Sequence, residues 1–144
     1  TLADQLKVDI TATDVAPVYK LMAIENVKIA DSPFWLQTML MKAGIRPINN
    51  VVDVTNYIML KYGQPLHAYD LDQLKNKTIS VAPAGENIKF TTLDDVEREL
   101  RPEDLVITAD GNPIAMAGVM GGMESEVSAQ TQNVVIEAAI FDSI

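Results

Sequence analysis

The spacing of apolar and polar positions predicts a helix in the first third of the chain. Between Pro33 and Ala43, apolar side chains recur three and four positions apart, which is the spacing of a helix with one buried face. Ser32 is a favourable N-cap residue, Pro33 suits the first helical position, and Gly44 follows the predicted end. We expect the buried face to consist of Trp35, Leu36, Met39, Leu40 and Ala43.

A second helix is predicted over Asn50–Lys61. Gly63 would end it, and residues 44–49 would connect it to the first helix. The next segment, residues 63–74, is rich in Gly, Pro and Asp, so it is interpreted as a turn region. The apolar positions of the second helix are Val51, Val54, Ile58 and Tyr62.

Strand patterns occupy the remainder of the chain. Val18–Ile29 alternates roughly between apolar and polar side chains, and from Thr78 onward short apolar runs are separated by turn compositions. Helices followed by five or more strands predict an α+β fold, with a mixed or antiparallel sheet and the helices packed on one side. The predicted runs are Ile79–Ala82, Ile88–Thr91, Leu105–Ala109, Ile114–Met116 and Val134–Phe141.

Composition excludes several classes of protein. The chain has 144 residues and 48% apolar residues, which is enough for a globular core. It has no cysteine, so disulfide scaffolds, zinc–thiolate sites, iron–sulfur clusters and cysteine nucleophiles are excluded. The longest uncharged stretch, residues 111–123, is shorter than the roughly 20 residues of a membrane-spanning helix. We therefore expect a soluble protein without a membrane partner.

The charge balance limits how nucleic acid could bind. Twenty acidic and 11 basic side chains give a net charge of −9. This net acidity argues against a surface that holds a phosphate backbone unaided. A polyanionic partner would have to be presented by another protein or held by a local basic spot.

His67 is the only histidine of the chain. A histidine can act as a general base near neutral pH, which makes it a candidate catalytic residue. The alternative is a histidine whose two nitrogens are satisfied within a turn. Because no serine has a diagnostic context, a serine–histidine–aspartate triad is not indicated.

Glu137 stands alone within the apolar run Val134–Phe141. A continuously apolar strand is usually buried on both faces, and a buried carboxylate must pair, take up a proton or line a cavity. Two interpretations remain open: a strand-end ion pair with Arg46 or a lysine, and a functional site.

Arg46 and a glycine-rich segment are the other candidates. Arg46 lies between the two predicted helices, where a guanidinium can meet a phosphate or a carboxylate, although a structural ion pair is equally compatible. Gly118 and Gly121 belong to a turn whose backbone N–H groups could approach a ligand, or which simply closes a hairpin. The Asp70–Asp72 pair lacks the rest of a calcium loop, and no metal site is predicted.

Four segments closely resemble the β subunit of bacterial phenylalanyl-tRNA synthetase. The likeness runs from about Val18 to the last residue and falls in the editing module of that subunit. The segments occur in the family's order, which makes the resemblance specific. They are GIRPINNVVDVTNY at 44–57, GQPLHAYD at 63–70, AMAGVMGG at 115–122 and TQNVVIE at 131–137.

The resemblance implies a function. Members of the family are cytoplasmic (αβ)₂ enzymes whose α subunit charges tRNA(Phe) with ATP and Mg²⁺, and the β-subunit module hydrolyses tyrosine wrongly attached to that tRNA. By resemblance, Glu137 would read the tyrosine hydroxyl, and His67 would help to orient the ester and the water. Gly118 and Gly121 would border the pocket, and Arg46 would lie at its rim near the 3′ end of tRNA(Phe). No cofactor is expected in the module itself.

The resemblance also sets the expected domain organisation. Residues 1–17 would be a tail or linker, and residues 18–144 an editing domain with a sheet curled toward a barrel. The family's module continues through a further pocket wall, so we expect 18–144 to be truncated at its C-terminal end and the isolated chain to edit and bind tRNA weakly. Two alternatives are a non-catalytic module that shapes the β subunit or positions the tRNA, and a free-standing editing protein.

Overall fold

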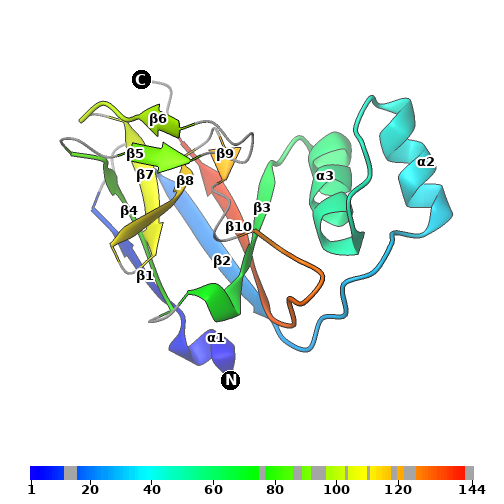
Figure 1. The fold of residues 1–144 in the computed structure, drawn as a ribbon, viewed down its shortest axis with the longest axis horizontal. Helices are drawn as coiled ribbons and strands as arrows, with labels where there is room; N and C mark the ends of the chain where they lie inside the picture. Colours follow the sequence, from blue (N-terminus) through cyan, green and yellow to red (C-terminus); the bar gives the residue numbers. More distant parts are fainter. Residues whose placement is uncertain are drawn as a thin grey trace.

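The computed structural model describes residues 1–11, 16–74, 77–85, 89–91, 97–102, 104–109, 111–117, 120–121 and 126–141 (Figure 1). Among these residues, the strands form a five-stranded sheet, a three-stranded sheet and a two-stranded ribbon. The helical elements are α1 (Leu2–Gln5), α2 (Phe34–Lys42), α3 (Asn50–Tyr62) and the 3₁₀ turn η1 (Leu71–Gln73). The strands are β1 (Lys7–Ile10), β2 (Val18–Ile24), β3 (Leu66–Asp70), β4 (Thr78–Pro83), β5 (Lys89–Thr91), β6 (Glu97–Glu99), β7 (Leu105–Ala109), β8 (Asn112–Met116), β9 (Met120–Gly121) and β10 (Val134–Ile140).

The predicted α+β class is confirmed. The five-stranded sheet has the order β1-β4-β7-β8-β9, with β1 parallel to β4 and the other neighbours antiparallel. The three-stranded sheet has the order β2-β10-β3 and is antiparallel throughout. α2 and α3 lie together on one side of the three-stranded sheet, and the sheets do not close into a barrel (Figure 1).

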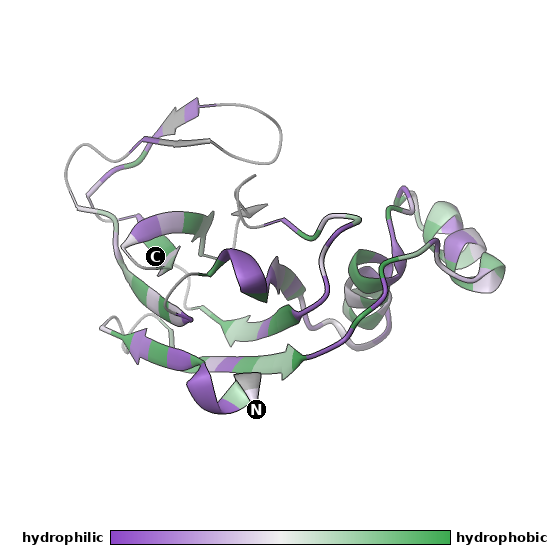
Figure 2. Cartoon of the chain, turned by 60° about the horizontal axis from the view of Figure 1, so that its bottom comes forward, coloured by the Kyte–Doolittle hydropathy of each residue, from purple (hydrophilic) through white to green (hydrophobic). Residues whose placement is uncertain are grey.

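The main core lies between the two larger sheets. Tyr69 of β3 and Val135 of β10 are fully buried there against Val81 of β4 and Ile107 of β7. Because side chains alternate between the two faces of a strand, hydrophobic and hydrophilic bands alternate along the strands in Figure 2. The space between the sheets is therefore apolar except where a polar residue occupies an inward position.

β10 is the central strand of the three-stranded sheet and is buried on both faces, as its apolar sequence predicts. Val135 belongs to the core between the sheets, while Val134 packs on the opposite face with Ala68 of β3. Val51 of α3 packs against that opposite face. Burial on both faces explains why a carboxylate within this strand requires polar partners from neighbouring strands.

Two expectations for the first predicted helix are wrong. α2 begins at Phe34, and Ser32 does not cap it because its hydroxyl donates to Asp53 Oδ2 at 2.6 Å. Leu36 and Leu40 form the buried face, whereas Trp35 (55% exposed), Met39 and Ala43 do not. α2 packs mainly against α3, and no strand contacts α2 as extensively. Only a narrow stripe of this helix is therefore buried.

α3 ends as the sequence predicts, and its start is fixed by a side-chain cap. Gly63 adopts a left-handed conformation (φ 72°) at the C-cap, which glycine reaches without steric cost. Asn49 accepts hydrogen bonds from the backbone N–H groups of Val51 and Val52. Asp53 in the first turn is fully buried and accepts from the Ile48 N–H at 2.8 Å.

Asp53→Ala is expected to lower the free energy of unfolding by about 3 kcal/mol, because it leaves the buried Ser32 hydroxyl and the Ile48 N–H without their acceptor. Urea unfolding followed by circular dichroism measures the change. Asp9→Ala, at an exposed position of β1, is the control and should change stability by less than about 0.5 kcal/mol. Equal effects of both substitutions would contradict this account of the α2–α3 connection.

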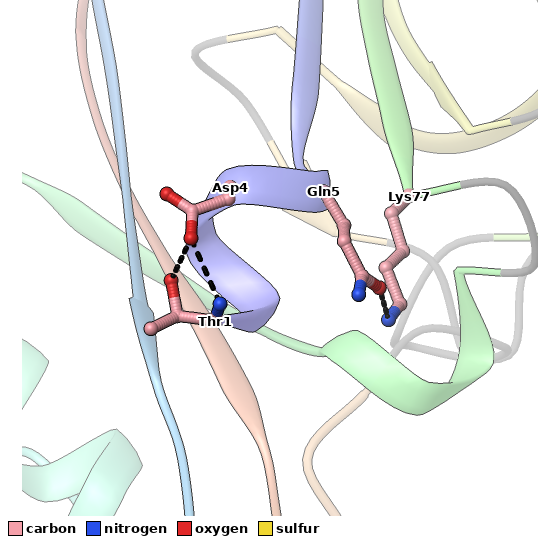
Figure 3. A network of polar contacts seen from close by, with 4 residues as sticks. All are labelled: Thr1, Asp4, Gln5 and Lys77. Atoms are coloured by element: carbon pink, nitrogen blue, oxygen red, sulfur yellow. Dashed lines mark hydrogen bonds and ion pairs between the residues drawn. The ribbon is translucent and has the colours of Figure 1, made fainter.

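The residues around β1 lie within 1–17, which the sequence analysis treats as a tail or linker. Residues 7–10 pair in parallel with β4, from Lys7 opposite Thr78 to Ile10 opposite Val81. The preceding short helix is held by the Thr1 amino group and hydroxyl, which both donate to Asp4 (Figure 3). Lys77 Nζ donates to Gln5 Oε1 at 2.6 Å, joining this helix to the segment before β4 (Figure 3).

The turn assignment for residues 63–74 is wrong in its central part. Leu66–Asp70 forms β3, which pairs with β10 along its whole length. Its inward positions are His67 and Tyr69, and Ala68 faces the opposite side. The five predicted strand runs after Thr78 all contain a strand, although Ile88 lies outside the described residues.

Candidate functional site

A cavity of about 520 Å³ opens between the two larger sheets. Its volume lies within the range of small-molecule sites in proteins. One wall is formed by β3 and β10, another by β7 and β8, and the mouth by the connection from α3 to β3. The lining residues are Gly63, Gln64, Pro65, Leu66, His67, Tyr69, Ile107, Ala115, Met116, Glu137, Ala139, Ile140 and Phe141.

The pairing of β3 with β10 places His67 and Glu137 side by side. They are register partners across the antiparallel ladder, so both side chains lie on the same face of the sheet. The next inward pair along the ladder is Tyr69 with Val135. His67 and Glu137 are separate candidates in the sequence, and the strand register brings them to one cavity.

Glu137 is 7% exposed and is paired with two tyrosines. The Tyr19 hydroxyl, from β2, donates to Oε2 at 2.5 Å, and the Tyr69 hydroxyl, from β3, donates to the same oxygen at 3.0 Å. Glu137 lies in the middle of β10, and no described cation forms an ion pair with it. The interpretation of a strand-end ion pair is therefore wrong, because phenols supply the polar contacts.

Burial and hydrogen bonding act in opposite directions on this carboxyl. Burial raises the pKa of Glu137 above its ordinary value, while the hydrogen bonds from Tyr19 and Tyr69 lower it. Burial, together with the nearby Glu137 carboxylate, raises the pKa of both tyrosines. Both phenols therefore keep their protons at neutral pH and remain donors.

His67 is half-buried beside the Tyr69 ring, with ring centroids 4.4 Å apart. Within the described ranges, no other residue forms a hydrogen bond with either ring nitrogen of His67. Burial lowers its pKa from the ordinary 6.5, so the imidazole is neutral at physiological pH. A neutral imidazole in a cavity, with no protein partner in this part of the chain, can accept a proton from a bound water.

The lowered pKa of His67 predicts a pH-dependent stability. Between the lowered pKa and 6.5, the unfolded chain binds the proton and the folded chain does not, so His67 contributes stability above pH 6.5 that is lost as the pH falls. Urea unfolding of wild type and His67→Gln from about pH 8 to about pH 5 isolates this contribution. We expect the wild-type advantage to shrink with acidification, by at most about 1.4 kcal/mol per pH unit. A constant difference would contradict burial of the neutral form.

The other predicted site residues are placed differently. Arg46 is exposed in the connector between α2 and α3 and does not line the cavity. Gly121 pairs with Ala115, which does line it, so the backbone of β9 runs beside the cavity wall. Gly118 lies outside the described residues. The roles implied for these three positions stay predictions.

Sequence reasoning missed Tyr19 and Tyr69 as the partners of Glu137. The signal for Tyr69 is its distance of two positions from His67, which places both on one face of a strand. That signal was lost when the segment was interpreted as a turn. Gln64 was also missed; its Nε2 donates to the Ala139 carbonyl at 3.3 Å and joins the cavity mouth to β10.

Within the described residues, no three His, Asp or Glu side chains are grouped so that they could hold a metal ion. Over the same residues, no helix combines the length and apolar character needed to cross a membrane.

Comparison with known families assigns the chain. The family model of the B3/4 domain matches residues 15–144, which is nearly the whole chain. The chain belongs to the B3/4 domain family. The cavity with His67 and Glu137 thus lies inside the matched region of this B3/4 domain.

Relatives of this B3/4 domain confirm the resemblance found in the sequence motifs. Two proteins named phenylalanine–tRNA ligase β subunit, from two strains of Staphylococcus aureus, are each 55% identical over 141 residues. The match covers 98% of this chain and 18% of each relative, so the chain spans about a fifth of their length.

A solved structure shares the fold of this B3/4 domain. It is an N-terminal fragment of the phenylalanyl-tRNA synthetase β subunit from Pyrococcus horikoshii, with a TM-score of 0.68. The likeness covers 93% of this chain and 43% of that one, at 16% sequence identity.

Proposed function

We propose that this B3/4 domain is a hydrolytic editing site that removes tyrosine from mischarged tRNA(Phe) within phenylalanine–tRNA ligase. The names of the 55% identical relatives support the assignment to that ligase. Its partners would be the 3′ end of tRNA(Phe) and the α subunit in an (αβ)₂ assembly in the cytoplasm. ATP and Mg²⁺ would serve the charging reaction elsewhere in that assembly.

One observation carries the proposal: a buried carboxylate and a neutral imidazole lie opposite each other in one cavity of small-molecule size. The carboxylate already accepts hydrogen bonds from two phenolic hydroxyl groups of the chain itself. A tyrosine side chain offers the same donor. The cavity therefore combines a group able to recognise a phenol with a group able to take a proton from water.

The physical basis of selectivity is the hydroxyl by which tyrosine differs from phenylalanine. A tyrosine in the cavity can donate to Glu137, whereas a phenylalanine leaves a buried acceptor unpaired. Sites that hydrogen-bond a substrate hydroxyl reject analogues that lack it far more strongly than apolar pockets discriminate by size. The apolar lining from Ile107 and Met116 would accept the ring in either case.

Ester hydrolysis would then proceed in the same cavity, with His67 as the base. Neutral His67 takes a proton as the water oxygen bonds to the tyrosyl carbonyl carbon. The bond from this carbon to the ribose oxygen breaks, and the ribose oxygen takes up a proton. Backbone N–H groups near Gly121 would supply donors to the developing oxyanion. The net charge of −9 fits a site that receives only the tRNA end while other domains hold the tRNA body.

A second candidate is a non-catalytic module that shapes the β subunit or positions the tRNA. The internal pairing of Glu137 favours it, because two tyrosines already satisfy Oε2 and give the carboxylate a structural role. Large exposed apolar side chains on α2 and α3, including Phe34 and Trp35, also suit a docking surface.

Binding of a non-hydrolysable substrate analogue distinguishes the two candidates. The probe is adenosine with tyrosine joined to the 3′ position by an amide, and the matched control carries phenylalanine. Calorimetric titration of the ligase containing this chain should show the tyrosyl compound bound about tenfold or more tightly, with the preference lost in Glu137→Ala. Equal affinities in wild type would refute the editing assignment and favour the non-catalytic module.

A further inference from the structure

The two oxygens of the Glu137 carboxylate have different surroundings. Both phenols donate to Oε2, and they come from opposite sides, Tyr19 from β2 and Tyr69 from β3. Among the described residues, none forms a hydrogen bond with Oε1. The two tyrosines thus hold the carboxylate through one oxygen, and no described residue forms a hydrogen bond with the other.

We propose that Tyr19 and Tyr69 are positioning residues that hold Glu137 as a hydrogen-bond acceptor and leave Oε1 for the hydroxyl of the bound amino acid. The inference rests on the proposed editing function and adds two specificity-determining residues to it. The tyrosines do not contact the scissile ester in this account; they act through Glu137.

The charge state of Glu137 sets how strongly it accepts a hydrogen bond from a phenol. An ionised carboxylate only accepts hydrogen bonds, whereas a protonated carboxyl has one oxygen occupied by its own proton. Burial favours the protonated form, and the two phenols are the groups that oppose it. The described titratable groups that face Glu137 are Tyr19, Tyr69 and His67. From the opposite sheet, Ile107, Ala115 and Met116 line the cavity and carry no charge.

Removing a phenolic hydroxyl should therefore affect recognition through protonation. With fewer donors on Oε2, the pKa of Glu137 rises further, and a larger fraction of the protein carries the protonated carboxyl at neutral pH. The Tyr19 hydroxyl lies nearer to Oε2 (2.5 Å) than that of Tyr69 (3.0 Å). We expect the loss of the Tyr19 hydroxyl to have the larger effect.

The test uses Tyr19→Phe, Tyr69→Phe and the double variant in the ligase containing this chain. The ratio of hydrolysis rates for Tyr-tRNA(Phe) and Phe-tRNA(Phe) is measured as a function of pH. Tyr57→Phe is the matched control, because that ring packs edge-on against Trp35 on the helix pair and does not line the cavity. Thermal melts establish that each variant is folded, and the substitutions preserve the ring volume.

The expected result is a shift of the pH profile. The pH at which the preference for tyrosine reaches half its maximum should rise by about one unit or more in Tyr19→Phe, and further in the double variant. At high pH the preference should return, which a purely structural defect would not allow. Unchanged profiles in folded variants, or a loss that no pH restores, would overturn the inference. If wild type hydrolyses neither ester, the proposed editing function is wrong. If wild type hydrolyses Tyr-tRNA(Phe) but the tyrosine variants keep its pH profile, only the positioning role of Tyr19 and Tyr69 is wrong.

Discussion

Glu137→Ala is expected to slow the hydrolysis of Tyr-tRNA(Phe) by about 100-fold and to leave slow hydrolysis of Phe-tRNA(Phe) unchanged. The substitution removes the buried acceptor for the substrate hydroxyl, and a hydrogen bond to a charged group contributes about 1.5–3 kcal/mol. Single-turnover deacylation with the ligase containing this chain measures both rates. Phenylalanine charging should continue, because the α subunit performs it in this account.

Two controls make that result interpretable. Glu97→Ala removes an exposed glutamate that pairs with Lys89 on the two-stranded ribbon, and it should leave both rates unchanged. Because Glu137→Ala leaves two buried phenols without their acceptor, its fold is checked by thermal melting, and Glu137→Gln keeps one acceptor oxygen for these phenols. Wild-type hydrolysis of Tyr-tRNA(Phe) in a folded Glu137→Ala protein would make this residue a structural acid.

His67→Ala is expected to lower the turnover of Tyr-tRNA(Phe) by about 100-fold or more while KM changes little. A positioned general base contributes about 10²–10⁴-fold to a rate, and this imidazole is neutral and has no hydrogen-bond partner among the described residues. Steady-state deacylation separates kcat from KM. A raised KM with an unchanged kcat would assign His67 to binding of the ester.

The pH dependence of turnover provides a second reading of His67. Because its pKa is lowered by burial, the base form persists below the ordinary 6.5, so wild-type activity should extend to more acidic pH than a solvent-exposed histidine would allow. His67→Ala should lack the activity that wild type retains at acidic pH.

Local sequence signals predicted much of the fold. The second helix was placed within one residue of its end, because Gly63 adopts the left-handed C-cap that glycine favours. β10 was recognised as a strand buried on both faces from its apolar run, which only Glu137 interrupts. In each case the deciding information lies within a few residues of the element.

Elements that depend on distant partners were not predicted. β3 follows Gly63-Gln64-Pro65 and ends at Asp70, a composition typical of a turn. It is nevertheless a strand, because β10 pairs with it along its length. The narrow buried stripe of α2 depends mainly on contacts with α3, so helical periodicity overstated its buried face. Tertiary pairing outweighed local composition at both places.

The candidate site shows the same division. Glu137 was identified because a charge within an apolar strand is costly and therefore informative. Its partners could not be identified, since Tyr19 is 118 positions away and reaches it only through the β2–β10 register. Sequence alone could name the acid; the strand order shows what holds it.

The most direct test of the central claim is the rate at which the wild-type ligase containing this chain deacylates Tyr-tRNA(Phe), with Phe-tRNA(Phe) measured in parallel. The account predicts rapid loss of the tyrosyl ester, and persistence of the phenylalanyl ester near its spontaneous rate of hydrolysis. Spontaneous rates for both esters would contradict an editing site between β3 and β10.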